Sequence, residues 1–264
     1  MTERSTMPPL EIRVAEALRR RNIRGAFFDL DDTLIVTGKT FGHYIAVYSQ
    51  ALAELFSATS TADALKGNPE YIYSFFIDTL KGLQKVFHVN QALLHESARI
   101  TALHLGLEYY SPEVQTLVAH LMQVYEGHMA SPSQGAHQTL RILRQAGVDP
   151  ILVTHAAPVS TRKKLRVAGL GVAEFAHIFC IDDLGVKGPD EWGYSLQQAG
   201  IAPQNAMVIG DNWKADIFPA LEIGVPVDQV VRVHADTHLT SPPISGIAQL
   251  EHVGQLPEHI AKAL

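Results

Sequence analysis

Residues 25–36 read GAFFDLDDTLIV, and this stretch decides the fold because it joins a buried strand to a group of acids. Four apolar side chains precede the Asp31–Asp32 pair and three follow it, a composition typical of a strand covered on both faces. Asp29, Asp31 and Asp32 nevertheless fall within four residues. Because an unpaired buried charge is costly, these carboxylates need compensating partners. The stretch therefore predicts a strand whose carboxyl end carries a functional site.

The segments that follow alternate between apolar runs and amphipathic helical patterns. We expect strands at residues 25–31, 148–155, 176–182, 205–211 and 228–234. Three of the intervening helices end in Gly shortly before the next strand, as a left-handed terminating residue would. Continuous apolar strands separated by helices predict an α/β fold with a Rossmann-like parallel sheet covered on both faces.

Residues 37–130 interrupt this alternation with four segments of helical spacing and no convincing strand. Four amphipathic helices of this length suit a small bundle. We therefore expect an N-terminal helical extension at 1–24, an α/β catalytic core at 25–36 and 131–264, and a helical-bundle cap at 37–130. An insertion after the first strand lies above the sheet edge where open α/β sheets bind ligands.

The composition excludes several classes of protein. The chain has 264 residues and a net charge of −6, so it lacks the basic surface of a nucleic-acid binder. No apolar run approaches the roughly 18 residues of a membrane span, and the N-terminus lacks a signal-peptide core. The single Cys180 excludes an intramolecular disulfide. We expect a cytoplasmic protein with a small-molecule partner and make no prediction of its oligomeric state.

Polar side chains collect where the predicted strands end. These residues are Asp29, Asp31, Thr154, Lys187, Asp211 and Asp216. Because the carboxyl ends of parallel strands meet at one edge, we expect the six side chains to converge on one crevice. Two carboxylates about 4 Å apart repel by about 4 kcal/mol at an effective dielectric near 20, more than Lys187 alone can offset across several pairs. Oxygen ligands without His or Cys favour a hard cation, and Mg²⁺ above all.

The same residues resemble the four motifs of the haloacid dehalogenase superfamily, whose members are mostly phosphatases. DLDDT (29–33) is similar to the first motif, DxDxT, and ILVTH (151–155) to the second, a hydrophobic strand that ends in Ser or Thr. Lys187 fits the third motif, and GDNWKAD (210–216) fits the fourth, GDxxxxD. The matches occur in order and cover residues 25 to 234, and the helical insertion resembles the C1 cap of that family.

The resemblance implies a catalytic role for particular residues. Asp29 would be the nucleophile that forms an aspartyl-phosphate, and Asp31 would protonate the leaving alcohol and later activate water. Thr154 and Lys187 would bind phosphoryl oxygens, with His155 as a further substrate-binding residue.

The resemblance also implies a Mg²⁺ site. Asp29, Asp211 and the backbone carbonyl of Asp31 would hold the cation, with Asp216 nearby. Asp32 should point away from its neighbours, and we interpret it as a turn former or helix cap.

Two features depart from the family pattern or compete with it. The lysine motif reads KGPDEW, with an extra Gly188 where the family has Lys-Pro-Asp-Pro. The run TRKKLR offers Lys163 and Lys164 as rival phosphate ligands. We interpret this run as a charged helical face in solvent.

The sequence thus predicts a Mg²⁺-dependent phosphomonoester hydrolase for a small metabolite, such as a sugar phosphate or nucleotide. A metal-independent haloacid dehalogenase is an alternative, but that chemistry does not need an acid at Asp31. A phosphomutase of the β-phosphoglucomutase type and a non-catalytic scaffold relative also stay open. A phosphonoacetaldehyde hydrolase would need a cap lysine, for which the sequence offers Lys39, Lys66, Lys81 and Lys85.

Overall fold

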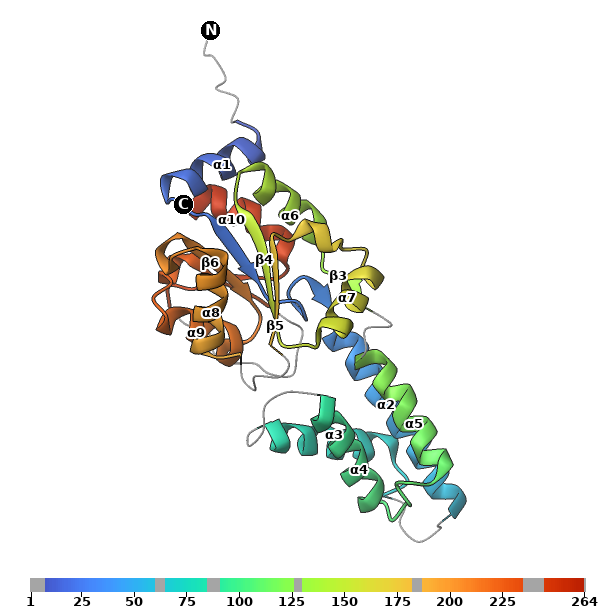
Figure 1. Ribbon diagram of the computed structural model, residues 1–264. Coiled ribbons are helices and arrows are strands. Elements are labelled where there is room, and N and C mark those ends of the chain that lie inside the picture. Colours follow the sequence, from blue (N-terminus) through green and yellow to red (C-terminus); the bar gives the residue numbers. More distant parts are fainter. Residues whose placement is uncertain are drawn as a thin grey trace.

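Figure 1 shows the computed structural model, which describes residues 8–59, 65–84, 91–125, 130–181, 187–234 and 245–263. Six parallel strands form its central sheet in the order β5-β4-β1-β6-β7-β8. The strands are β1 (Gly25–Phe28), β4 (Asp149–Thr154), β5 (His177–Cys180), β6 (Ala206–Gly210), β7 (Val230–Val233) and β8 (Ala248–Leu250). Because β1 pairs with both β4 and β6, the carboxyl ends of these three strands lie side by side.

The α/β fold predicted from the sequence is confirmed, but one strand of the sheet is shorter than predicted and another was not predicted. The first strand ends at Phe28 rather than at Asp31, because the chain turns there and Asp31 forms an isolated bridge with Ile35. Strand β8 was not predicted, since its three residues include the exposed Gln249 and form no continuous apolar run. Asp182 of the third predicted strand lies outside the described residues, as does most of the segment that precedes β8.

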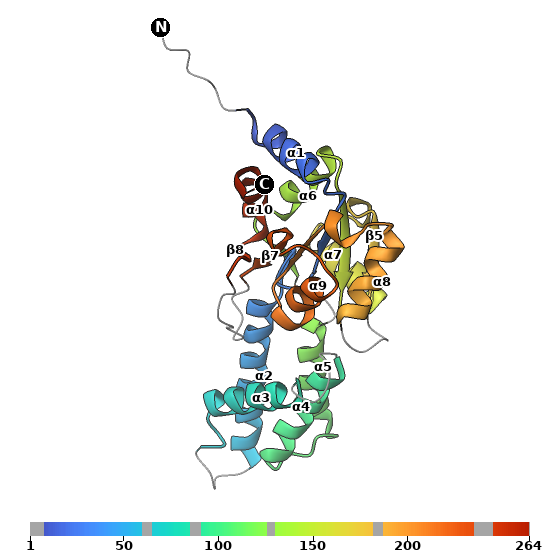
Figure 2. The ribbon, with the colours of Figure 1, turned by 90° about the vertical axis from the view of Figure 1, so that its left-hand side faces the viewer.

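Helices cover both faces of the sheet, as its continuous apolar strands require. One face carries α1 (Leu10–Arg20), α6 (Ala136–Gln145), α7 (Pro158–Val167) and α10 (Leu256–Ala263), and the other carries α8 (Pro189–Ala199) and α9 (Phe218–Glu222) (Figures 1 and 2). Successive residues of β1 serve the two layers, since Phe28 belongs to the first core cluster and Phe27 to the second. With both faces covered, a ligand can approach the sheet only at its ends.

Helix α1 is the helix predicted within the N-terminal extension. Its buried residues Val14, Ala17 and Leu18 recur at helical spacing and join the core cluster of the first layer. The helix contacts α6 and α10, and Arg13 forms an ion pair with Glu258 of α10 at 3.4 Å. This helix is therefore packed onto the core rather than held apart from it.

Four helices follow β1 where the sequence predicts four amphipathic segments. They are α2 (Gly38–Thr59), α3 (Pro69–Gln84), α4 (Gln91–His104) and α5 (Pro112–Tyr125). This four-helix module has a buried cluster of its own, which includes Ile45, Leu52 and Phe76. It lies beyond the carboxyl ends of the strands (Figure 1). Among the described residues, no helix combines the length and apolar character that crossing a bilayer requires.

Two short strands connect the module to the sheet. Strand β2 (Ile35–Val36) precedes α2 and pairs antiparallel with β3 (Ser131–Pro132), which follows α5. The Ser133 amide extends the pairing by donating to the Leu34 carbonyl at 2.8 Å. The chain thus enters and leaves the module through adjacent segments. The sequence did not reveal these strands because two residues are too few for a hydrophobic pattern.

Candidate active site

Asp29 directly follows the central strand β1. Its amide donates to the Ile209 carbonyl at 2.9 Å, which continues the pairing with β6 and fixes the backbone. The buried Asp29 carboxylate forms an ion pair with Lys187, whose ammonium is also buried. Lys187 further contacts Asp216 at 2.6 Å and donates to the Val153 carbonyl at 3.2 Å. One ammonium group therefore joins two carboxylates, which follow β1 and β6, to a backbone carbonyl of β4.

Three carboxylates gather around this ammonium group. Asp29, Asp211 and Asp216 each place one oxygen within 4.8 Å of the others. Asp216 lies on the π-helical turn Trp213–Ile217 after β6, and its Oδ2 accepts from the Asn212 amide at 3.0 Å. A side chain at Gly210 could not be accommodated, because its Cβ would lie 2.5 Å from Asp216. The glycine of the GDNWKAD motif therefore makes room for the last aspartate of that motif.

The three acids of this cluster carry more negative charge than the single ammonium group of Lys187 can balance. Burial raises the pKa of Asp29 to about 7, although Lys187 offsets part of the rise. Burial also raises the pKa of Asp211 well above its ordinary value, and the charges of Asp29 and Asp216 raise it further. Burial alone would lower the pKa of Lys187, but Asp216 and Asp29 outweigh it and raise that pKa.

These properties fit a divalent cation. Three carboxylates and one lysine leave a surplus of two negative charges, which one such ion would balance. All the donor atoms are carboxylate oxygens, the ligands that hard cations such as Mg²⁺ prefer. Asp29, Asp211 and Asp216 could therefore hold a metal ion, as the sequence predicts for these three residues.

Thr154 ends β4 beside the aspartate cluster. Its side chain is 1% exposed, and its Oγ1 has no hydrogen-bond partner among the described residues. A buried hydroxyl without a partner is costly, so this oxygen is suited to bind a ligand at this strand end. His155, the next residue, is half-buried at the same strand end.

Asp31 lies outside the cluster of three carboxylates and has a lysine of its own. The ammonium of Lys164 lies 2.8 and 2.6 Å from its two carboxylate oxygens. Lys164 is only 5% exposed, so the interpretation of TRKKLR as a solvated face is wrong at this position. The helix α7 turns Lys164 inward together with Thr161 and Leu165, while Arg162 and Arg166 remain exposed.

Asp32 has the structural role that its position predicts. It adopts a left-handed backbone conformation with φ of 58°, and its Oδ1 accepts from the amides of Thr37 and Gly38 at 2.8 and 2.7 Å. These amides would otherwise lack partners at the start of α2. Asp32 therefore anchors the four-helix module to the loop that carries Asp29 and Asp31.

The lysine loop accommodates its extra residue at the start of α8. Gly188 precedes Pro189, the first residue of that helix, and its amide donates to Glu191 at 3.0 Å. The Lys187 ammonium lies 5.5 Å from the centre of the Trp192 ring, and the ring nitrogen of Trp192 donates to the Ala215 carbonyl at 2.7 Å. The departure from the family pattern therefore leaves Lys187 buried among the acids.

Arg232 is a site residue that the sequence analysis missed. It lies on β7, is 3% exposed, and donates from Nε to the Asp211 carbonyl at 3.0 Å. Its guanidinium lies 5.0 Å from the centre of the Trp213 ring. Burial lowers the pKa of Arg232, and Asp211 opposes that change. The available signal was a single arginine within the apolar segment VVRV, because a buried charge is costly unless it is paired or hydrogen-bonded.

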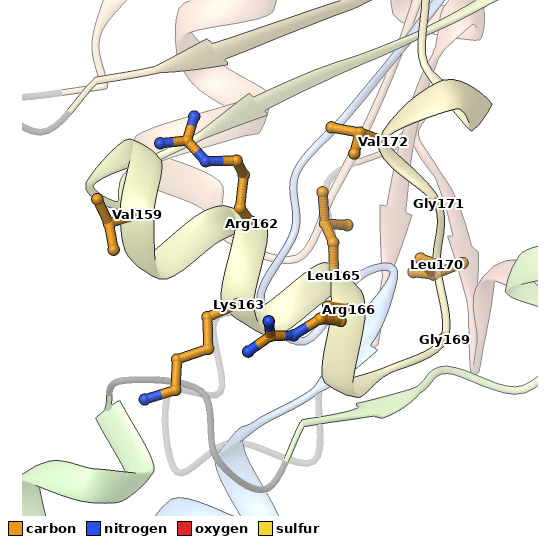
Figure 3. Close-up of a pocket in the computed structure, with 9 residues that line it drawn as sticks. All are labelled: Val159, Arg162, Lys163, Leu165, Arg166, Gly169, Leu170, Gly171 and Val172. Carbon is orange, nitrogen blue, oxygen red and sulfur yellow. The ribbon is translucent and has the colours of Figure 1, made fainter.

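A separate hollow lies along the outer side of α7. Figure 3 shows it between this helix and the following segment, with Arg162, Lys163 and Arg166 around apolar residues such as Leu165 and Leu170. Lys163, the other rival phosphate ligand, lines this hollow. None of the carboxylates of the aspartate cluster does so.

Comparisons with known proteins show which family this chain resembles. The family model of the haloacid dehalogenase-like hydrolases matches residues 23–224. A pyrimidine 5′-nucleotidase of Streptococcus pneumoniae is 23% identical over 82% of this chain and 87% of its own. A glyceraldehyde 3-phosphate phosphatase of Pyrococcus furiosus is 26% identical over 78% of this chain and 79% of its own.

Solved structures agree on the fold. A haloacid dehalogenase-like hydrolase of Xanthomonas campestris has a TM-score of 0.66 at 14% identity, covering 92% of each chain. A putative β-phosphoglucomutase of Thermotoga maritima has a TM-score of 0.64 at 14% identity, covering 92% of this chain and all of that one. At such low identity these structures establish the shared architecture alone.

Proposed function

Since the chain belongs to the haloacid dehalogenase-like hydrolases, we propose that it is a Mg²⁺-dependent phosphomonoester hydrolase acting on a small phosphorylated metabolite. The observation that carries this proposal is the buried Asp29 carboxylate, paired with Lys187 beside Asp211 and Asp216. By their names, the two curated relatives act on a nucleotide and a triose phosphate, which supports a small phosphate ester as the substrate.

The cation would be held by Asp29, Asp211 and the backbone carbonyl of Asp31, with Asp216 nearby. When bound, Mg²⁺ offsets negative charge so that a carboxylate can approach a phosphate dianion. Burial raises the pKa of Asp29 to about 7, Lys187 lowers it in part, and the neighbouring charge of Asp216 raises it further.

In the first half-reaction, a carboxylate oxygen of Asp29 attacks phosphorus. The new bond is an aspartyl-phosphate, and the ester P–O bond breaks with its electron pair on the departing oxygen. Asp31 donates a proton to that oxygen, so an alcohol leaves. Lys187 and the Thr154 hydroxyl bind phosphoryl oxygens, and His155, at the same strand end, is a further substrate-binding residue.

In the second half-reaction, water attacks the phosphorus of the aspartyl-phosphate. Asp31, now a carboxylate, removes a proton from the water as its oxygen bonds to phosphorus. The bond from phosphorus to Asp29 breaks, which releases inorganic phosphate and restores both carboxyl groups to their starting forms.

We assign the cap to residues 37–130, which include the four-helix module, and the catalytic core to residues 25–36 and 131–264. The antiparallel pair β2 and β3 places the entry and exit of the module side by side. Rotation near residues 37–38 and 131–135 would move the module over the carboxyl ends of the strands. Closure would exclude bulk water from the aspartyl-phosphate.

The test is phosphate release from a panel of sugar phosphates, nucleotides and triose phosphates, with Mg²⁺ or with EDTA. We expect turnover that needs Mg²⁺ and that is lost in the Asp29→Asn variant. Asp149→Asn is the matched control, because Asp149 is an exposed carboxylate at the opposite end of β4. If Asp29→Asn hydrolysed esters as fast as the wild type, Asp29 would not be the nucleophile.

The same assays separate the alternatives. A mutase would transfer phosphate to a second sugar position rather than to water. A metal-independent dehalogenase would release chloride from haloacids in EDTA. A scaffold relative would bind Mg²⁺ and hydrolyse none of the esters.

A further inference from the structure

A lysine on α7, Lys164, contacts Asp31, the second aspartate of the DLDDT motif. The Lys164 ammonium lies 2.8 and 2.6 Å from the two carboxylate oxygens of Asp31. We propose that Lys164 is a positioning residue, which holds the Asp31 carboxyl group in the orientation for proton transfer to and from the substrate. The inference rests on the proposed function, in which Asp31 is the acid and base.

Lys164 is buried, unlike a lysine that only makes a helix surface soluble. Thr161, Lys164 and Leu165 form the buried stripe of α7, at the spacing of one helical face. A lysine on such a stripe must bring its ammonium to a partner, because an unpaired buried charge is costly. The Lys164 side chain is 7% exposed, whereas that of Asp31 is 34% exposed. The acid therefore borders solvent while its cation lies behind it.

This geometry serves both protonation states of Asp31. As a carboxylate, Asp31 offers both oxygens to the ammonium and keeps lone pairs for a proton of the attacking water. As an acid, it can keep one oxygen on Lys164 and present its O–H group to the departing alcohol. Without Lys164, rotation about the side-chain bonds would place the carboxyl group in several directions. A misplaced catalytic group of this kind costs up to about 100-fold in rate.

Each of the two lysines of the site contacts a different aspartate of the DLDDT motif. Lys187 contacts the proposed nucleophile Asp29 from the loop before α8, and Lys164 contacts Asp31 from α7. The other cations of α7 are among the residues that line the hollow of Figure 3, and Arg166 is exposed. Arg166 is therefore a matched control on the same helix.

The experiment compares two leaving groups. An alkyl phosphate needs a proton on its departing oxygen, whereas the nitrophenolate of p-nitrophenyl phosphate leaves without one. We expect Lys164→Met to lower kcat/KM for the alkyl ester by about 10- to 100-fold and for the aryl ester by less than about threefold. Lys164→Arg should recover most of the activity, and Arg166→Met should match the wild type.

A double-variant cycle tests whether Lys164 acts through Asp31. The Asp31→Asn/Lys164→Met protein should be no slower on the alkyl ester than Asp31→Asn alone. The inference would be overturned if the losses of the two single variants multiplied in the double variant. It would also be overturned by an equal loss on both esters in a Lys164→Met protein of unchanged melting temperature. Should Lys164→Met fail to fold, Lys164→Gln and the double variant, which removes both charges, provide the same comparison.

Failure of the proposed function would look different. In that case the wild type would hydrolyse no ester, or Asp31→Asn would lose kcat/KM equally on both leaving groups. The inference alone fails if Asp31→Asn discriminates between the leaving groups and Lys164→Met does not.

Discussion

The Lys187 ammonium lies 2.6 Å from Asp216 Oδ1 and contacts the Asp29 carboxylate from the same position. A single buried cation thereby joins an acid that follows β1 to one that follows β6. All three side chains are buried, so water screens their charges only weakly and each charge interacts strongly with the other two. We therefore expect the aspartate cluster to depend on Lys187 for stability as well as for the proposed reaction.

Replacement of Lys187 should show both dependences. We expect Lys187→Met to abolish measurable turnover and to lower the free energy of unfolding by about 3–5 kcal/mol, since it leaves buried carboxylates uncompensated. Urea unfolding of the metal-free protein measures the second effect. The Lys187→Met/Asp216→Asn protein should recover part of the lost stability, because it removes a charge of each sign. A Lys187→Met protein as stable as the wild type would contradict this account of the cluster.

Mg²⁺ should stabilise the protein most at neutral and higher pH. The pKa of Asp29 rises from an ordinary 3.8 to about 7 on folding, so folded Asp29 keeps its proton at pH values where the unfolded chain loses it. The resulting stability is complete below the lower value and is lost as pH rises through the higher one. The metal-free protein should therefore lose stability between these values. The cation, which needs the ionised carboxylate, should restore it.

Thermal melting across pH 5–8 with Mg²⁺ or EDTA measures this dependence. The increase in melting temperature on adding Mg²⁺ should be larger at the upper end of the range. Asp211→Asn removes one ligand and should abolish most of the increase. A Mg²⁺ effect that did not depend on pH would argue against Asp29 as a ligand.

Much of the fold could be predicted because its signals are local. Five strands are continuous apolar runs, and the helices of the module repeat apolar residues at helical spacing. The neighbourhood of Asp29, Asp211 and Asp216 followed from one rule, that parallel strands end at the same edge. Strands β2, β3 and β8 could not be predicted, because each has only two or three residues and depends on a partner strand elsewhere in the chain.

The two missed contacts of the site have a different cause. In TRKKLR, cations surround Leu165, so hydrophobic spacing alone could not identify which lysine faces the sheet. Arg232 binds the backbone carbonyl of Asp211, and a backbone acceptor has no signature in the sequence. Both contacts depend on how a helix or strand packs in the fold. The amino-acid type of a single residue does not determine that packing.

Asp32 should stabilise the start of α2 through its two amide contacts. We expect Asp32→Ala to lower the free energy of unfolding by about 1–2 kcal/mol, the usual cost of a lost helix cap. Asp32→Asn is the control, because it keeps an acceptor oxygen and tolerates the left-handed backbone at φ of 58°. Hydrogen exchange of the Thr37 and Gly38 amides reports the contact directly, and it should accelerate in the alanine variant. Unchanged exchange in that variant would show that these amides are protected in another way.

Arg232 should support the cation site without touching the cation. Its Nε holds the Asp211 carbonyl at 3.0 Å and its guanidinium lies over Trp213, so it fixes the backbone that presents the Asp211 carboxylate. Loss of such a supporting contact typically weakens metal affinity by about 10- to 100-fold. We expect this loss in Arg232→Met, measured by calorimetric Mg²⁺ titration, and a smaller loss in Arg232→Lys, which keeps the charge but not the planar group. Arg24→Met, which removes an exposed arginine, is the control. Wild-type Mg²⁺ affinity in Arg232→Met would show that Asp211 is held in place without this arginine.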